Sequence, residues 1–213
     1  MQVRLFYVHD PMCSWCWGFR PTFEALKHKL EARHPAIELE YVLGGLAPDS
    51  DEVMPAQMQH FLIQTWKKIQ SQLGTEFNFE FWDKVTPVRN TYSACRAVLA
   101  AQNQGAGEAM IDAIQKAYYL EAQAPHLKQT HMALAQNLGL DLITFESDLL
   151  SQSLEDEFQR QRELAQALNA QGFPSLILGY ETLQGLQITL IRIDYLDADA
   201  MLEQIESMLT QLK

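Results

Sequence analysis

Cysteine is scarce in this chain, with three among 213 residues. A small and odd number of cysteines argues against a secreted fold held together by disulfides, and it fits a compartment in which thiols stay reduced. Hydrophobic residues make up 47% of the chain, which is ample for a packed core without crosslinks. The fold is therefore not expected to depend on cysteine pairing.

Long apolar runs and an excess of basic residues are also missing. No stretch approaches the roughly 20 apolar residues of a membrane-spanning helix, and the apolar run at residues 3–8 is too short for a signal-peptide core. We therefore expect a cytoplasmic protein. With 16 Lys and Arg against 27 Asp and Glu, the net charge is −11, so neither nucleic acid nor an anionic membrane surface is an expected partner.

Two of the three cysteines, Cys13 and Cys16, stand three residues apart where a strand pattern gives way to a helix pattern. A helix N-terminus stabilises the thiolate, the reactive form of cysteine, through free backbone N–H groups and the helix dipole. Cys16, nearly one turn into the helix, is close enough to attack a mixed disulfide at Cys13 and release the substrate. The spacing predicts Cys13 as the nucleophile and Cys16 as the resolving thiol.

The spacing leaves two other interpretations of the pair open. It also fits half of a zinc site in a non-catalytic module, or two small buried residues. A structural zinc site usually needs four ligands, however, and the remaining cysteine, Cys95, has no second cysteine or histidine beside it. No metal is therefore expected, and Cys95, among alanines in a helix pattern, is interpreted as a packing residue.

Strand and helix patterns divide the chain into three parts. Strands are predicted at residues 3–8, 37–43, 173–180 and 187–193, and helices from about residue 13 to 30 and at 55–73, 92–104, 108–121, 128–137, 142–150, 155–169 and 197–212. The first two strands and the helix between them predict a parallel βαβ unit. An aromatic loop at residues 77–82 is expected to cover the core, with a substrate cleft as the alternative.

The βαβ unit bearing Cys13-x-x-Cys16, the helical segment, and Gly172-Phe173-Pro174-Ser175 ahead of the third strand together resemble the thioredoxin superfamily, and more closely its DsbA-like branch. Residues 10–19 further resemble the FrnE-type subgroup of dithiol-disulfide isomerases and oxidoreductases. The resemblance covers essentially the whole chain. It implies an α/β thioredoxin fold, βαβ then ββα, with a large all-α insertion. The implied thioredoxin-like domain is residues 1–46 and 172–213, and the inserted helical domain is residues 47–171.

The resemblance also implies a cis peptide bond between Phe173 and Pro174, with Pro174 facing Cys13. Proline has no backbone N–H to place beside the sulfur, while the backbone of Phe173 stays free to pair with an extended substrate. Phe173 and Pro174 are therefore expected to bind substrate. The alternative is an ordinary trans proline that begins an edge strand.

This chain departs from the family pattern at the residue that handles the proton of the second cysteine. Many thioredoxin-like relatives carry a buried carboxylate six residues before the first cysteine, where this chain has Tyr7. His9 is the nearest titratable substitute, although a lone histidine at a strand end is more often a surface or capping residue. We name His9, together with Trp15 between the cysteines, as supporting residues only.

These observations together predict a thiol-disulfide oxidoreductase or isomerase that acts on protein or small-molecule thiols and disulfides. No resident cofactor is expected, and glutathione is a candidate reductant or co-substrate. The alternative is a glutathione-dependent enzyme resembling the kappa-class transferases and 2-hydroxychromene-2-carboxylate isomerases. Those enzymes typically have a serine in the place of Cys13, so the intact cysteine pair argues against them.

Overall fold

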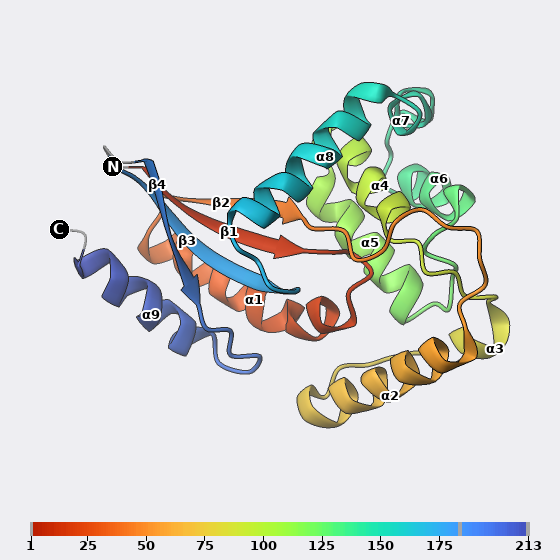
Figure 1. Ribbon diagram of the computed structural model, residues 1–213, viewed down its shortest axis with the longest axis horizontal. Helices are drawn as coiled ribbons and strands as arrows, with labels where there is room; N and C mark the ends of the chain where they lie inside the picture. The colour runs from red at the N-terminus through yellow and green to blue at the C-terminus, as the bar shows by residue number, and fades with distance from the viewer. Residues whose placement is uncertain (1, 183–184, 212–213) are drawn as a thin grey trace.

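The computed structural model describes residues 2–182 and 185–211. Figure 1 shows a central sheet with helices on both sides, and the start of the first strand and the end of the last helix lie at the same end of the molecule. The chain begins with β1 (Val3–His9), α1 (Ser14–Arg33) and β2 (Ile37–Leu43), and it ends with β3 (Ser175–Thr182), β4 (Gly185–Ile191) and α9 (Ala198–Gln211). Between them lie α2 (Ala56–Leu73), α3 (Phe81–Lys84), α4 (Tyr92–Gln102), α5 (Gly107–Tyr119), α6 (Lys128–Asn137), α7 (Leu142–Leu149) and α8 (Gln152–Ala167).

The sheet has the strand order β2-β1-β3-β4. β1 runs parallel to β2 and antiparallel to β3, and β3 and β4 form an antiparallel pair. β1 is central because its sequence, VRLFYVH, is apolar enough to be buried on both faces. The predicted fold class, a βαβ unit followed by a ββα unit with a helical insertion, is confirmed.

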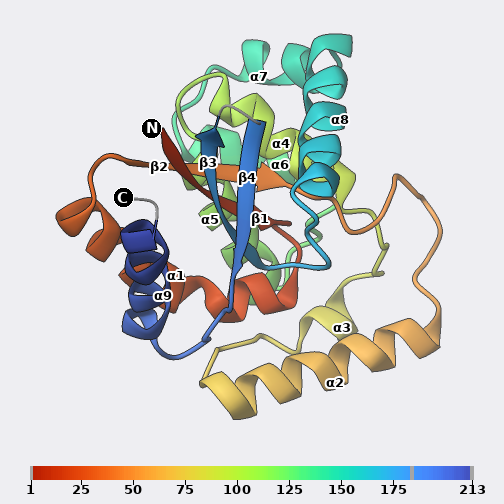
Figure 2. The same ribbon diagram turned by 60° about the vertical axis from the view of Figure 1, so that its left-hand side comes forward.

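Helices cover the two faces of the sheet with separate apolar clusters. Figure 2 shows α1 and α9 on one side of the sheet and α8 on the other. On the first face, Leu5 and Tyr7 of β1 pack against α1 and α9. On the second, Phe6 and Val8 pack against the C-terminal end of α8. Successive side chains of a strand point to opposite faces. Tyr7 therefore points toward the helix that carries Cys16.

The insertion, α2 to α8, has its own packing. Cys95 lies in a core with residues of α4, α5, α7 and α8, while Trp66 of α2 is surrounded by aromatic rings that include Phe77 and Tyr119. The aromatic run at residues 77–82 thus mostly covers a core, as predicted, although the short helix α3 begins within it. The domain boundaries remain predictions.

Several element ends differ from the prediction. β3 begins two residues late because its pairing with β1 starts at Ser175, opposite Val8. β4 begins two residues early because its register with β3 pairs Thr182 with Gly185. The polar turn predicted through Glu181 and Gly185 includes residues 183–184, which lie outside the described residues, as does the last predicted helical residue, Leu212. α8 begins three residues early because the side chain of Ser151 caps it.

Within residues 2–182 and 185–211, no helix combines the length and the hydropathy that crossing a membrane requires.

Candidate active site

Cys13 is the N-cap residue of α1, with an extended backbone at φ −79° and ψ 116°. The backbone N–H of Cys16 donates a hydrogen bond to Cys13 Sγ at 3.3 Å. All three cysteines of the chain are free thiols. The predicted position of Cys13 at a helix N-terminus is confirmed, and the Cys16 N–H is a contact that favours negative charge on the Cys13 sulfur.

The two cysteines of the pair differ in their surroundings. Cys13 retains 5% of its surface exposed, whereas Cys16 is fully buried. Burial raises the pKa of the Cys16 thiol well above its ordinary value, and the neighbouring Cys13 raises it further. A substrate can therefore reach Cys13 alone, while Cys16 needs help to lose its proton.

The peptide bond between Phe173 and Pro174 is cis, as predicted. Cys13 Sγ donates a hydrogen bond to the carbonyl oxygen of Phe173 at 3.4 Å, which places the start of β3 beside the thiol. Phe173 and Pro174 also line a pocket of about 420 Å³ with Ile188 and Leu190 of β4. These contacts bring both residues to the site, and their role in binding substrate remains a prediction.

Gly44, the residue directly after β2, leaves room for the Phe173 ring. A Cβ atom on Gly44 would lie 2.0 Å from Cζ of Phe173. The backbone N–H of Gly44 donates to the carbonyl oxygen of His9 at 2.8 Å, so this contact is anchored to the strand that leads to the cysteines. The absence of a side chain at residue 44 is therefore what lets the loop before β3 approach.

Asp10 organises the turn ahead of Cys13, a role that its sequence pattern alone does not reveal. Its carboxylate is fully buried and accepts hydrogen bonds from the backbone N–H groups of Met12 and Leu46 and from the hydroxyl of Thr91, each at 2.7 Å. Burial raises the pKa of Asp10, while these hydrogen bonds oppose the rise. An Asp-Pro pair before the cysteines is a recognisable turn signal, but the partners of Asp10 could not be inferred from it.

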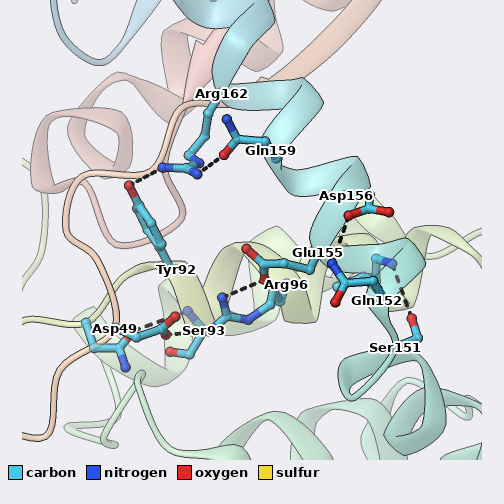
Figure 3. Close-up of polar contacts among 12 residues, drawn as sticks. Asp49, Tyr92, Ser93, Arg96, Ser151, Gln152, Glu155, Asp156, Gln159 and Arg162 are labelled. Carbon is cyan, nitrogen blue, oxygen red and sulfur yellow. Dashed lines mark hydrogen bonds and ion pairs between the residues drawn. The ribbon is translucent and has the colours of Figure 1, made fainter.

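Thr91 precedes α4, whose first turns are held by the polar cluster in Figure 3. The guanidinium of Arg96 pairs with Asp49, in the segment after β2, and with Glu155 of α8, the latter at 3.1 Å. In the same cluster, Arg162 of α8 donates to the hydroxyl of Tyr92 at 2.6 Å. These bridges fix the end of α4 that presents Thr91 to Asp10.

Two aromatic residues of the insertion also bind the active-site turn. The indole N–H of Trp66 donates to the hydroxyl of Ser14 at 3.0 Å, and the hydroxyl of Tyr119 donates to the carbonyl oxygen of Met12 at 2.7 Å. Neither residue has a sequence signal that would link it to the cysteines. The conformation of the turn thus depends on contacts from α2, α4 and α5.

His9 is a core residue, so its interpretation as a surface or capping residue was wrong. Its ring stacks on Tyr7 with centroids 4.9 Å apart and meets the ring of Tyr41 edge-on. Neither ring nitrogen has a hydrogen-bond partner within the described part of the chain. Burial lowers the pKa of His9 to about 3, so the ring is neutral at physiological pH.

Trp15 lies beside the pair, half-buried, as expected for a residue between the cysteines. Its ring packs edge-on against Tyr195, with centroids 5.2 Å apart, and the ammonium of Lys68 lies 5.7 Å from the ring centroid. A supporting role for Trp15 in the reaction remains a prediction.

Cys95 is a buried helix residue, as predicted, with a neighbour that was not foreseen. Its Sγ lies 3.7 Å from Asp10 Oδ2, and burial raises the pKa of its thiol well above the ordinary value. Among residues 2–182 and 185–211, no group of three or more His, Cys, Asp and Glu side chains is placed to hold a metal ion. The described residues thus offer no ligand set for the zinc interpretation.

Several known proteins are similar to this chain. The crystal structure of a putative protein disulfide isomerase from Nitrosomonas europaea superimposes with a TM-score of 0.83 at 23% identity, covering 99% of both chains. The cytosolic disulfide reductase DsbM from Pseudomonas aeruginosa superimposes with a TM-score of 0.72 at 26% identity, covering 98% of this chain and 99% of DsbM. A second DsbM structure contains GSH.

A curated relative, the ClpXP adapter protein SpxH of Bacillus subtilis, is 26% identical over 178 residues. The match covers 82% of this chain, but the chain spans only 57% of the length of that relative. A family model for the DSBA-like thioredoxin domain matches residues 3–190. This chain therefore belongs to the DSBA-like thioredoxin domain family.

Proposed function

We propose that this protein is a thiol-disulfide oxidoreductase that works through a mixed disulfide at Cys13, which Cys16 resolves. The observation that carries the proposal is the position of Cys13 Sγ. It lies between the backbone N–H of Cys16 at 3.3 Å and the carbonyl oxygen of Phe173 at 3.4 Å. A thiol held by a helix N-terminus is suited to attack a disulfide.

In the reducing direction the reaction has two displacement steps. The Cys13 thiolate attacks one sulfur of a substrate disulfide, so a bond forms between Cys13 and that sulfur while the substrate disulfide breaks and its other sulfur leaves as a thiolate. The Cys16 thiolate then attacks Cys13 Sγ, and the second substrate thiolate leaves. The substrate gains two electrons and the enzyme ends with a Cys13–Cys16 disulfide.

Phe173 and Pro174 would align the substrate for the first step. The backbone of Phe173 borders the Cys13 sulfur, and an extended substrate segment could form main-chain hydrogen bonds along this edge. The apolar pocket beside Pro174, lined also by Ile188 and Leu190, offers room for a hydrophobic side chain near the scissile disulfide.

We further propose the reducing direction, a cytoplasmic location and glutathione as the electron donor. Two observations support this combination: DsbM, which is 26% identical, is described as a cytosolic disulfide reductase, and one of its structures contains GSH. Against a cytosolic poise of roughly −220 to −320 mV, a moderately oxidising couple is kept mostly reduced. Two glutathione thiols would return the Cys13–Cys16 disulfide to the dithiol and leave as glutathione disulfide.

Insulin reduction by Cys13→Ser, Cys16→Ser and Cys95→Ala tests the proposal. Cys13→Ser should be inactive, Cys16→Ser should accumulate a mixed disulfide at Cys13, and Cys95→Ala should retain reductase activity. Reductase activity in Cys13→Ser would overturn the assignment of the nucleophile. A glutathione-stimulated activity on a small electrophile that survives Cys16→Ser would favour the transferase alternative. The reduction potential of the Cys13/Cys16 couple tests the proposed direction.

A further inference from the structure

A cavity of about 430 Å³ lies behind Cys16, on the side away from the Phe173–Pro174 loop that borders Cys13. It lies between the thioredoxin-like part of the chain and α5. Residues of β1, α1, β2 and α5 line it, among them Tyr7, Cys16, Phe23 and Gln115. The buried resolving cysteine thus borders a space that also contacts charged residues nearer the surface.

Tyr7 and Cys16 are neighbours at the inner end of this cavity. The Tyr7 ring is locked by stacking on Phe23, with centroids 4.0 Å apart, and on His9 at 4.9 Å. Burial raises the pKa of Tyr7 well above its ordinary value, and the charge and hydrogen bonding of Cys16 raise it further. Tyr7 is therefore a neutral phenol that can donate a hydrogen bond to the Cys16 sulfur.

Gln115 of α5 gives independent evidence that the cavity is wet. Its side chain is 2% exposed, and its Oε1 has no hydrogen-bond partner among the described residues. A buried acceptor that the protein does not satisfy is commonly satisfied by water. The cavity is large enough for several water molecules, and the Tyr7 hydroxyl and Gln115 Oε1 supply polar partners for them.

We propose that the Tyr7 hydroxyl and water in this cavity form the proton route of Cys16, in place of the buried carboxylate of other thioredoxin-like proteins. The inference rests on the proposed function, because it concerns the second displacement step of that reaction. Tyr7 stabilises the developing Cys16 thiolate by hydrogen bonding, and the cavity connects the sulfur to solvent. Tyr7 is thereby a catalytic residue, since it contacts a reacting atom.

The step balances as follows for a substrate bound to Cys13 as a mixed disulfide. The Cys16 S–H gives its proton to a cavity water, which passes it to bulk solvent, and the Tyr7 O–H donates to the sulfur as negative charge develops. The Cys16 thiolate attacks Cys13 Sγ, the bond between Cys13 and the substrate sulfur breaks, and the substrate thiolate takes a proton from solvent. Reduction of the enzyme reverses the path.

Other ionisable groups face the Cys16 sulfur or this cavity. They are Cys13, Asp10, Tyr41, Tyr119, Tyr195, Arg20, Glu24, His28, Glu108 and Asp112. The Asp10 carboxylate already accepts hydrogen bonds from Met12, Leu46 and Thr91, and the Cys95 thiol also contacts it. Arg20 and Asp112 form an ion pair with each other. His9 lines a different cavity. The Tyr41 hydroxyl bonds Glu108 and the Tyr119 hydroxyl donates to the carbonyl oxygen of Met12, whereas the Tyr7 hydroxyl bonds the Cys16 thiol.

Single-turnover kinetics of Tyr7→Phe test the route. A substrate disulfide with a chromophoric leaving group reports the attack of Cys13, and acid quenching followed by mass spectrometry reports the decay of the mixed disulfide. Tyr7→Phe keeps the stacked ring, so the rate of attack by Cys13 should be unchanged. The decay of the mixed disulfide should be slower than in the parent protein by a factor of about ten or more. The pH dependence of that decay should also move to higher pH. Tyr118→Phe, a buried tyrosine outside the cavity, is the matched control and should change neither.

Two further variants distinguish a failure of the proton route from a failure of the proposed function. Gln115→Leu should slow the decay of the mixed disulfide, because it removes a polar partner of the cavity water, and decay at the parent rate in this variant would contradict the part of water in the route. Decay of the Tyr7→Phe mixed disulfide at the parent rate and with the parent pH dependence would overturn the route. In Cys16→Ser, a mixed disulfide that never forms would instead overturn the proposed function, since the first step does not involve Tyr7.

Discussion

The side chains of Asp10 and Thr91, 81 residues apart in the sequence, share a hydrogen bond of 2.7 Å in the interior of the protein. Asp10 begins the turn that leads to Cys13, and Thr91 begins the first long helix of the core that surrounds Cys95. Together with the bonds from Trp66 and Tyr119, this contact makes the helical insertion a support for the cysteine turn. The insertion is therefore part of the machinery that shapes the site.

Asp10→Asn should destabilise the protein by about 1.5–3 kcal/mol, the usual range for lost hydrogen bonds to a buried charged group. The carboxylate serves two backbone N–H groups and one hydroxyl, whereas an asparagine turns an N–H₂ group toward some of those donors. Equilibrium unfolding in urea measures the change. Asp83→Asn, at an exposed position, is the control and should leave the free energy of unfolding nearly unchanged.

Tyr119→Phe should cost about 1 kcal/mol of stability, because it removes the hydrogen bond to the carbonyl oxygen of Met12 while keeping the ring. The loss should appear near the site as faster amide hydrogen exchange in the turn before Cys13. Tyr118→Phe is the neighbouring control, since the described residues include no hydrogen bond from its hydroxyl to Met12 or Ser14. Equal exchange in the two variants would contradict the anchoring role of Tyr119.

Gly44→Ala should displace the Phe173 ring, because the added Cβ would lie 2.0 Å from Cζ. Overpacking of this kind typically costs about 1–3 kcal/mol, and substrate reduction should fall with it if Phe173 aligns the substrate. A double-mutant cycle isolates the contact. In a Phe173→Ala background, Gly44→Ala should cost much less stability, and additive effects would show that the clash is relieved elsewhere.

The fold and the reactive pair could be predicted because their signals are local. A buried strand, a cysteine pair at a helix start and a Phe-Pro pair before another strand each have a pattern within a few residues. The resemblance to a family then predicted that the Phe173–Pro174 segment lies beside Cys13. The ends of β3 and β4 differ from the prediction by two residues because cross-strand pairing, which runs from Leu176 with Ile191 to Thr182 with Gly185, sets them, and a pairing register has only a weak sequence signal.

The hydrogen bonds that hold the turn before Cys13 could not be predicted, because they join segments that are distant in the sequence. Thr91, Trp66 and Tyr119 are ordinary helix residues by pattern, and their roles arise from where the insertion packs. His9 was misjudged for a related reason: histidine at a strand end is commonly exposed, but here Tyr41 and the α5 region close over it. Burial, which decides the chemistry of Tyr7, His9 and Cys16, is a property of the assembled layers.

His9 should make the protein sensitive to acid. Burial lowers its pKa to about 3 in the folded state, against an ordinary value of about 6.5 in the unfolded chain. Stability from this difference is fully present above pH 6.5 and is lost as the pH falls toward 3, because only the unfolded chain binds the proton. At pH 5, about 1.5 pH units below 6.5, His9 alone should lower the free energy of unfolding by about 2 kcal/mol, because each pH unit contributes about 1.36 kcal/mol.

His9→Phe should remove that loss while keeping a ring to stack on Tyr7. Urea unfolding between pH 7.5 and pH 4.5 measures the free energy of unfolding of the variant and of the parent protein. Below pH 6, the slope of this free energy against pH should be smaller in the variant by about 1.4 kcal/mol per pH unit. The remaining slope should include His131, whose burial lowers its pKa to about 4. His60→Phe, at an exposed position, should keep the parent slope. The same slope in His9→Phe would mean that His9 binds its proton in the folded protein, which requires a partner for a ring nitrogen.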